Sequence, residues 1–225
     1  MQFTVNGKPL EVALRHLMIA GWTGRDREAL ESHIAEMVAV GIAAPATVPI
    51  YYPIAAALLT GEEAIQVVGP QTSGVVEPML LQVGRRRYLG LASDHTDRAL
   101  AGRSIGLAKQ VCAKPCATAL WPWEEVADRL DDLRLESWIM DEASGDWLPC
   151  QRGTLAAIRP LAELAADSGL MARADDGPAA LLCGTLGVLT GGVRAASRFR
   201  MSLVDEMRGR AIRHQYEVEE LPEIR

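Results

Sequence analysis

The 225-residue sequence contains few cysteines, and their spacing excludes two classes of protein. Cys112, Cys116, Cys150 and Cys183 are too few and too irregularly placed for a disulfide framework. Cys112 and Cys116 lie four positions apart, which is not the Cys-x-x-Cys spacing of a zinc knuckle or a redox site. We therefore expect reduced thiols and a cytoplasmic protein.

The sequence also lacks a surplus of basic residues and a long apolar run. Its 23 Lys and Arg against 29 Asp and Glu give a net charge of −6, which argues against a nucleic-acid partner. No apolar run approaches the roughly 20 residues that a membrane-spanning helix needs. The opening MQFTVNGKPLEV has no apolar core of a signal peptide. We expect neither nucleic acid nor a membrane as a partner.

Strand-like runs dominate what is present. Asn6-Gly7 predicts the tight turn of one hairpin, and Ser144-Gly145 predicts the turn of another. Pro78 lies inside a strand-like run and predicts a sheet edge or a bulge there. The pattern predicts strands, some of them paired as hairpins, over 3–12, 15–22, 63–69, 74–83, 86–92, 133–151, 179–186, 197–205 and 210–221.

Helical patterns are fewer and do not alternate regularly with the strands. Asp26 begins a predicted helix that runs to about Val40, with Gly41 as its stop. This order favours a mixed α/β fold that is rich in β-strand, with peripheral helices. Without a repeat or a low-complexity linker, we expect a single domain over 1–225. Further helices are predicted over 97–110, 121–130 and 160–169, and a polar loop over 171–178.

His33 and Glu36 are three positions apart on the first predicted helix, so their side chains are neighbours. We expect His33 at the core-facing edge of the apolar stripe formed by Leu30, Ile34 and Met37. A carboxylate beside an imidazole raises its basicity, as a general base requires. The alternative is a surface pair without a function.

Two carboxylates stand at unusual places in the strands. Glu77 interrupts an apolar run, where burial is costly unless the carboxylate is paired or binds a cation. The alternative is a side chain that faces solvent. Asp94 follows a strand end in SDHTDR, and the alternative is a turn or a helix cap, with Thr96 or Asp97 as the cap.

Lys109 follows an apolar helical face and precedes a predicted strand. It is a candidate cation for anchoring a substrate, although lysines are usually solvated. Taken in order, these features resemble the fumarylacetoacetate hydrolase superfamily over about residues 14–222. The sequence is identified as a member of a branch of this superfamily. The motifs do not assign an activity to that branch. The resemblance rests on the His33-x-x-Glu36 dyad, a strand carboxylate at Glu77, Asp94 followed by Arg98, Lys109 before a proline-containing strand, and the Gly184-Thr185 turn.

The resemblance implies a β-roll of mixed sheets in a homodimer, and an enzyme that acts on a small 2-oxo or β-diketo acid. In the superfamily, Mg²⁺ or Mn²⁺ stabilises an enolate during C–C bond hydrolysis. By resemblance, the metal ligands are Glu77 and Asp94, and the catalytic residues are His33, Glu36 and Lys109. The residues at the substrate are Gly184, Thr185 and Arg98, of which Arg98 also braces the Asp94 motif.

One departure leaves alternatives open. The superfamily strand reads Glu-x-Glu, but Val75 replaces the first glutamate here. Glu77 and Asp94 could suffice with help from substrate, or Asp97, His95 or Gln71 could be recruited. A lyase, meaning a decarboxylase or hydratase, and a catalytically degenerate ligand-binding or structural dimer are the other hypotheses. We expect substrate specificity to lie in the loops 41–53, 141–153 and 170–178.

Overall fold

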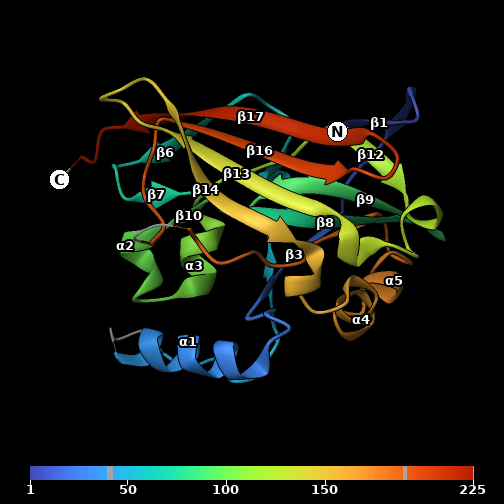
Figure 1. The fold of residues 1–225 in the computed structure, drawn as a ribbon, viewed down its shortest axis with the longest axis horizontal. Coiled ribbons are helices and arrows are strands. Elements are labelled where there is room, and N and C mark those ends of the chain that lie inside the picture. The colour runs from blue at the N-terminus through green and yellow to red at the C-terminus, as the bar shows by residue number, and fades with distance from the viewer. Residues whose placement is uncertain (40–42, 190–191, 225) are drawn as a thin grey trace.

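The computed structural model describes residues 1–39, 43–189 and 192–224. Strands form two main sheets, and Figure 1 shows the five-stranded sheet lying across the eight-stranded one with helices at the periphery. Both parallel and antiparallel pairs occur, which confirms the prediction of a mixed, β-rich fold.

The eight-stranded sheet runs in the order β2-β1-β12-β9-β8-β15-β3-β4. Its members are β1 (Gln2–Val5), β2 (Lys8–Glu11), β3 (His16–Gly21), β4 (Ile50–Ile54), β8 (Val76–Val83), β9 (Arg86–Ser93), β12 (Ala119–Pro122) and β15 (Ala179–Leu182). The five-stranded sheet, in the order β14-β13-β16-β17-β6, comprises β6 (Ala64–Val68), β13 (Arg134–Met140), β14 (Trp147–Thr154), β16 (Arg198–Asp205) and β17 (Arg210–Leu221).

Two short ladders complete the strands, and short helices fill the connections. The ladders pair β7 (Thr72–Ser73) with β10 (Thr96–Asp97) and β5 (Leu59–Thr60) with β11 (Lys114–Pro115). The α-helices are α1 (Arg27–Ala39), α2 (Arg98–Ala101), α3 (Ile105–Gln110), α4 (Leu161–Asp167) and α5 (Leu170–Arg173). The 3₁₀ turns are η1 (Ala56–Leu58), η2 (Trp123–Glu125), η3 (Leu130–Asp132) and η4 (Leu155–Ala157). In the part of the chain that the structure describes, no helix is long and apolar enough to cross a membrane.

The core explains why the run at 76–83 is apolar almost throughout. Side chains of a strand alternate between its two faces. Leu80 therefore packs with the cluster between the two main sheets, while Met79 and Leu81 pack with a second cluster on the opposite face. A strand buried on both faces has no solvent side and needs no polar alternation.

Pro78 lies in a central strand, so the prediction of an edge or a bulge was wrong. β8 pairs with both β9 and β15, and its register with β9 is unbroken. The ladder with β15 ends at Met79, and the Pro78 carbonyl accepts a hydrogen bond from the Cys183 amide at 3.0 Å. In an antiparallel strand the N–H and C=O of one residue point to the same side. The N–H that Pro78 lacks would therefore point toward β15, where the regular pairing with β15 has already ended.

The hairpins turn as predicted. β1 and β2 pair around Asn6 and Gly7, whose φ angles are 48° and 75°, and β13 and β14 pair across the turn that contains Gly145. No α-helix forms over the predicted 121–130: Trp121 pairs with Leu89 of β9 and belongs to β12, and the helical part is limited to the 3₁₀ turn η2 and the start of η3. The predicted polar loop over 171–178 begins as the helix α5.

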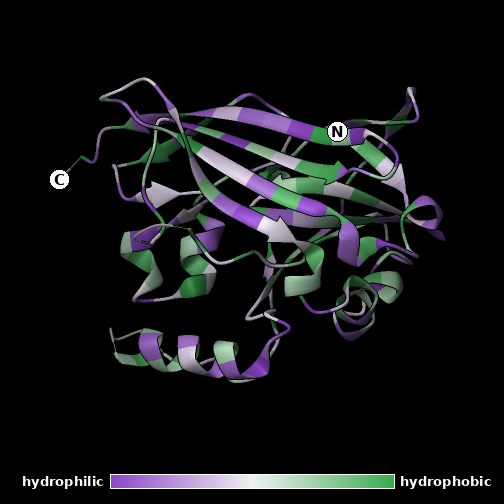
Figure 2. Cartoon of the chain, in the orientation of Figure 1, coloured by the Kyte–Doolittle hydropathy of each residue, from purple (hydrophilic) through white to green (hydrophobic). Residues whose placement is uncertain are grey.

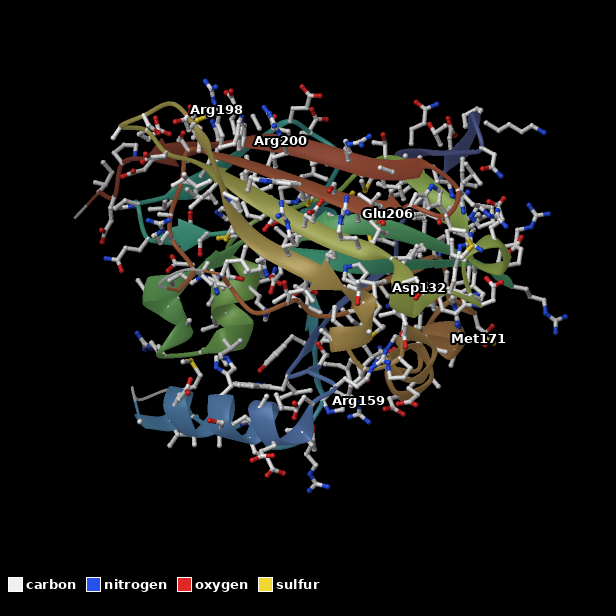
Figure 3. All side chains as sticks on the ribbon, viewed as in Figure 1. Asp132, Arg159, Met171, Arg198, Arg200 and Glu206 are labelled. Carbon is white, nitrogen blue, oxygen red and sulfur yellow. The ribbon has the colours of Figure 1, made fainter. Side chains whose placement is uncertain are left out.

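The outward side of the five-stranded sheet is strongly charged. Figure 3 labels Arg198, Arg200 and Glu206, which come from β16 and the turn after it. Arg200 lies 4.1 Å from the centre of the Trp147 ring, and Arg198 pairs with Glu217 at 3.1 Å. This alternation of polar and buried residues leaves the opposite side of the sheet for the core.

Helix α1 lies apart from the sheets in Figure 1. Asp26 caps it by accepting a hydrogen bond from the Ala29 amide at 3.1 Å, as the sequence predicts. The expected end at Val40 and Gly41 lies outside the described residues. Figure 2 shows hydrophilic and hydrophobic residues mixed along α1, and its residues 27–39 include no buried side chain. Leu30, Ile34 and Met37 of the expected stripe are half-buried while the other residues of 27–39 are exposed, so the stripe is the least exposed side of α1 but is not packed into the core.

Candidate active site

A cavity of about 850 Å³ lies between α1, the end of β3 and the turn after β15. It brings together residues from across the chain that the sequence analysis selected. The predicted loops 141–153 and 170–178 contribute no described residue to its lining, and 41–53 contributes Tyr52. Of the three loops expected to set substrate specificity, 41–53 therefore supplies a described residue to this lining. The predicted site residues in the lining are His33, Glu77, Arg98, Lys109, Gly184 and Thr185.

Antiparallel pairing places Glu77 near Asp94. Val76 of β8 pairs with Ser93 of β9. Glu77 directly follows Val76 and Asp94 directly follows Ser93, so the pairing brings the two residues close together. The Glu77 carboxylate is 2% exposed and accepts a hydrogen bond from the Gly184 amide at 2.7 Å. Burial and the nearby Asp94 raise the pKa of Glu77 to about 8. The solvent-facing alternative for Glu77 is thereby excluded.

Asp94 is held by two lysines. Its Oδ2 accepts a short hydrogen bond from Lys109, and its Oδ1 lies 3.4 Å from the Lys114 ammonium. Thr96 donates to the same Oδ1 at 3.1 Å. Burial alone would raise the pKa of Asp94, but the two lysines outweigh it and lower the pKa to about 2. Asp94 is therefore an ionised group paired inside the protein.

Lys114 is the residue that the sequence analysis missed. It is fully buried in β11, and its ammonium donates to the Lys109 carbonyl at 2.6 Å and to the His95 carbonyl. Burial lowers its pKa, because an ammonium loses its hydration inside the protein. The signal was available: a lysine in the apolar stretch VCAKPCA needs a buried partner.

The other polar residues near Asp94 are engaged elsewhere. Both ring nitrogens of His95 are used, by the Tyr216 hydroxyl at 3.0 Å and the Thr72 hydroxyl at 2.9 Å. Burial and nearby cations lower the pKa of His95 to about 3. Asp97 caps α2 by accepting from the Leu100 amide at 3.0 Å. Neither is free to join a metal site.

Arg98 braces the Asp94 segment while it lines the cavity. Its guanidinium donates to the Ser73 hydroxyl at 2.6 Å and to the Ser73 carbonyl at 3.0 Å. These bonds join the start of α2 to the strand β7. A bracing role for Arg98 is therefore consistent with its contacts.

The Gly184-Thr185 turn requires glycine for two reasons. Gly184 has a φ of +89°, and a Cβ there would lie 1.8 Å from the Thr23 hydroxyl oxygen. The Thr185 hydroxyl donates to the Val76 carbonyl at 2.5 Å and accepts from the side-chain amide of Gln151 at 2.6 Å. The Gly184 amide and the Thr185 hydroxyl thus have protein partners.

His33 and Glu36 are neighbours as predicted, but they lie in solvent. The His33 Nδ1 is 3.7 Å from a Glu36 oxygen, and the two side chains are 57% and 68% exposed. The His33 ring lies 5.6 Å from the Trp22 ring, and both residues line the cavity. The expectation of a core-facing His33 was wrong, because α1 is not packed into the core.

The donor set does not fit a resident divalent ion. Val75 lines the cavity where the superfamily pattern has a glutamate, and it offers no oxygen. Within residues 1–39, 43–189 and 192–224, no group of three His, Cys, Asp or Glu residues could hold a metal ion. Mg²⁺ prefers octahedral oxygen ligands, whereas both oxygens of Asp94 face lysine ammonium groups.

The fold is that of the fumarylacetoacetate hydrolase-type proteins, with which the chain aligns over nearly its full length. A candidate fumarylacetoacetate isomerase/hydrolase from Oleispira antarctica is 16% identical, with a TM-score of 0.65 and coverage of 97% of this chain and 99% of that one. Fumarylpyruvate hydrolase from Pseudomonas aeruginosa, solved with Mn²⁺ and pyruvate, is 15% identical, with a TM-score of 0.61 and coverage of 98% and 96%.

A 2-keto-3-deoxy-D-arabinonate dehydratase, solved with magnesium and 2,5-dioxopentanoate, is 13% identical, with a TM-score of 0.63. That alignment covers 98% of this chain and 79% of the dehydratase. Residues 20–216 match the family described as "Protein of unknown function (DUF2848)", and the chain belongs to that family. No curated protein sequence matches it. At these identities the solved structures establish the fold alone.

Proposed function

We propose that the chain is an enzyme, with a single catalytic domain over 1–225, that acts on a small 2-oxo or β-diketo acid through an enolate. C–C bond hydrolysis is the favoured reaction. One observation carries the proposal: the cavity combines the Lys109 and Arg98 cations with the Glu77 carboxylate and the His33 imidazole. Fold neighbours solved with pyruvate and with 2,5-dioxopentanoate support this substrate class.

Lys109 carries the central role in this proposal. Its ammonium is fixed by Asp94 and lies 5.6 Å from the centre of the Tyr52 ring, at the cavity wall. A preorganised cation stabilises the negative charge that develops on an enolate oxygen. Arg98 contributes a second positive charge for the substrate carboxylate.

His33 is the proposed general base, and Glu36 is its positioning partner. Base catalysis of this kind contributes a factor of roughly 10²–10⁴ to the rate. Gly184 and Thr185 also line the cavity, and binding of a carboxylate there requires the Gly184 amide and the Thr185 hydroxyl to change partners. Of the predicted Mg²⁺ or Mn²⁺ ligands, Glu77 lines the cavity, whereas Asp94 contacts the lining residue Lys109 without lining the cavity itself.

The reaction class is tested with a panel of 2-oxo and β-diketo acids and mass detection of the products. Uptake of water into two fragments identifies a hydrolase, and loss of CO₂ or water identifies the lyase alternative, which the dehydratase neighbour favours. Lys109→Met abolishes turnover, whereas the exposed Lys8→Met is the matched control. Turnover by Lys109→Met at the wild-type rate contradicts the proposal.

A second candidate is a catalytically degenerate ligand-binding dimer, which Val75 favours because it removes a carboxylate from the site. Binding of a 2-oxo acid without any product across the whole panel identifies this case. Assembly as a homodimer in the cytoplasm is part of both proposals, and light scattering of the purified protein measures the assembly.

A further inference from the structure

Lys114 is a buried charged residue that the proposed function does not use. It is fully buried, and its ammonium has three oxygen neighbours: the Asp94 carboxylate, the Lys109 carbonyl and the His95 carbonyl. The ammonium thus makes two hydrogen bonds to backbone carbonyls and an ion-pair contact with Asp94 at 3.4 Å. A buried lysine of this kind needs a reason beyond surface solubility.

The contacts of Lys114 fix the position of Lys109. Lys114 bonds the backbone of Lys109 and shares the Asp94 carboxylate with the Lys109 side chain. Lys109 thus lines the cavity, whereas Lys114 is outside the lining and contacts Lys109. Lys114 is therefore a positioning residue and not a group that touches substrate.

The charged side chains around Asp94 carry more positive than negative charge before any metal is added. Asp94 is influenced by the three cations Lys109, Lys114 and Arg98, and the second carboxylate nearby is Glu77. Adding a divalent cation beside Asp94 would place it next to two ammonium groups, which repel it. Val75 removes the third carboxylate that would offset this repulsion.

Resting on the proposed function, we propose that the Lys109–Lys114 pair at Asp94 takes the place of the metal: Lys109 contacts the 2-oxo acid, and Lys114 holds Lys109 in position, so that this site takes its ligand without a divalent metal ion. The ligand class is the carboxylate and adjacent oxo group of a small oxo acid. The pair replaces the missing ion through fixed ammonium groups instead of coordination bonds.

Isothermal titration calorimetry with oxalate, an enolate mimic, tests this proposal on the metal-stripped protein in EDTA and again in excess Mn²⁺. We expect oxalate to bind in EDTA, with an affinity that Mn²⁺ changes by less than about threefold, well under the tenfold that 1.4 kcal/mol represents. A titration of Mn²⁺ alone shows no binding, which paramagnetic resonance of free Mn²⁺ checks independently of activity.

The two possible failures differ. Oxalate binding that requires Mn²⁺ overturns the metal-free inference and leaves the oxo-acid function standing. No oxalate binding in either condition overturns the proposed function and the inference with it. These wild-type measurements do not depend on whether any variant folds.

Variants then separate the pair from its surroundings. Lys114→Met keeps the length of the side chain and removes its charge, so we expect oxalate binding in EDTA to weaken about tenfold or more. Lys8→Met is the matched control and leaves the affinity unchanged. In the double variant Val75→Glu/Lys114→Met, which restores a carboxylate and removes a cation, we expect Mn²⁺ binding to appear. Wild-type affinity in Lys114→Met, or no Mn²⁺ binding by the folded double variant, contradicts the role of Lys114.

Discussion

The pairing of Asp94 with two buried lysines predicts that Asp94→Asn destabilises the fold strongly. The Asp94 carboxylate is 2% exposed, and its pKa falls from 3.8 to about 2, which corresponds to about 2 kcal/mol of net interaction with its surroundings. The amide of asparagine cannot neutralise Lys109 and Lys114. Breaking a buried ion pair in this way costs about 3–5 kcal/mol. A role for Asp94 in function alone would not predict this loss.

Urea unfolding at pH 7, followed by tryptophan fluorescence, measures the loss. Two comparisons sharpen the result. Asp94→Asn/Lys114→Met removes one of the two stranded ammonium groups, so we expect part of the stability to return. Glu77→Gln costs less than Asp94→Asn at pH 7, because burial and Asp94 raise the pKa of Glu77 to about 8 and keep it largely protonated.

A loss below about 1 kcal/mol in Asp94→Asn would refute the reasoning, because exposed ion pairs contribute no more than that. Asp176→Asn is the matched surface control, since Asp176 pairs with Arg15 in solvent. Equal losses in Asp176→Asn and Asp94→Asn would show that burial of the carboxylate does not set the cost.

Three further predictions follow from the cavity and its supports. Gly184→Ala destabilises the protein by about 2 kcal/mol or more, because the added Cβ meets Thr23 at 1.8 Å in a backbone with φ +89°. Thermal unfolding measures this, and Gly187→Ala, with nothing within 4 Å, is the control that should be nearly neutral. His33→Gln lowers turnover by roughly 10²–10⁴ without changing stability, since the side chain is 57% exposed; unchanged turnover contradicts the general-base role. Burial lowers the pKa of His95 from 6.5 to about 3, so the folded protein contains the neutral form of His95. Its contribution to stability is therefore complete above about pH 6.5 and declines as the pH falls toward 3, by up to about 5 kcal/mol. Urea unfolding between pH 7 and 4 measures this slope, which should be smaller in His95→Gln; an equal slope would show that His95 does not cause it.

Strand positions were largely readable from the sequence because turn chemistry and apolar runs act locally. Asn6-Gly7 determines its turn through backbone conformations that few residues adopt. The resemblance to a known superfamily grouped Glu77, Asp94 and Lys109, and in the structure the β8–β9 pairing and the Lys109–Asp94 hydrogen bond bring them close together. The sequence did not reveal that Pro78 sits in the centre of the sheet, since that depends on where the β15 ladder ends.

The sequence by itself determined the β-rich fold, and six of its eight predicted site residues line the cavity. Only the tertiary structure decided their electrostatic state. Lys114 is five positions from Lys109 in the chain, and the fold turns both ammonium groups onto Asp94. His33 and Glu36 are neighbours on any helix, but the packing of α1 leaves them exposed. Local spacing fixes which side chains can meet, whereas burial and charge pairing depend on contacts between segments far apart in sequence.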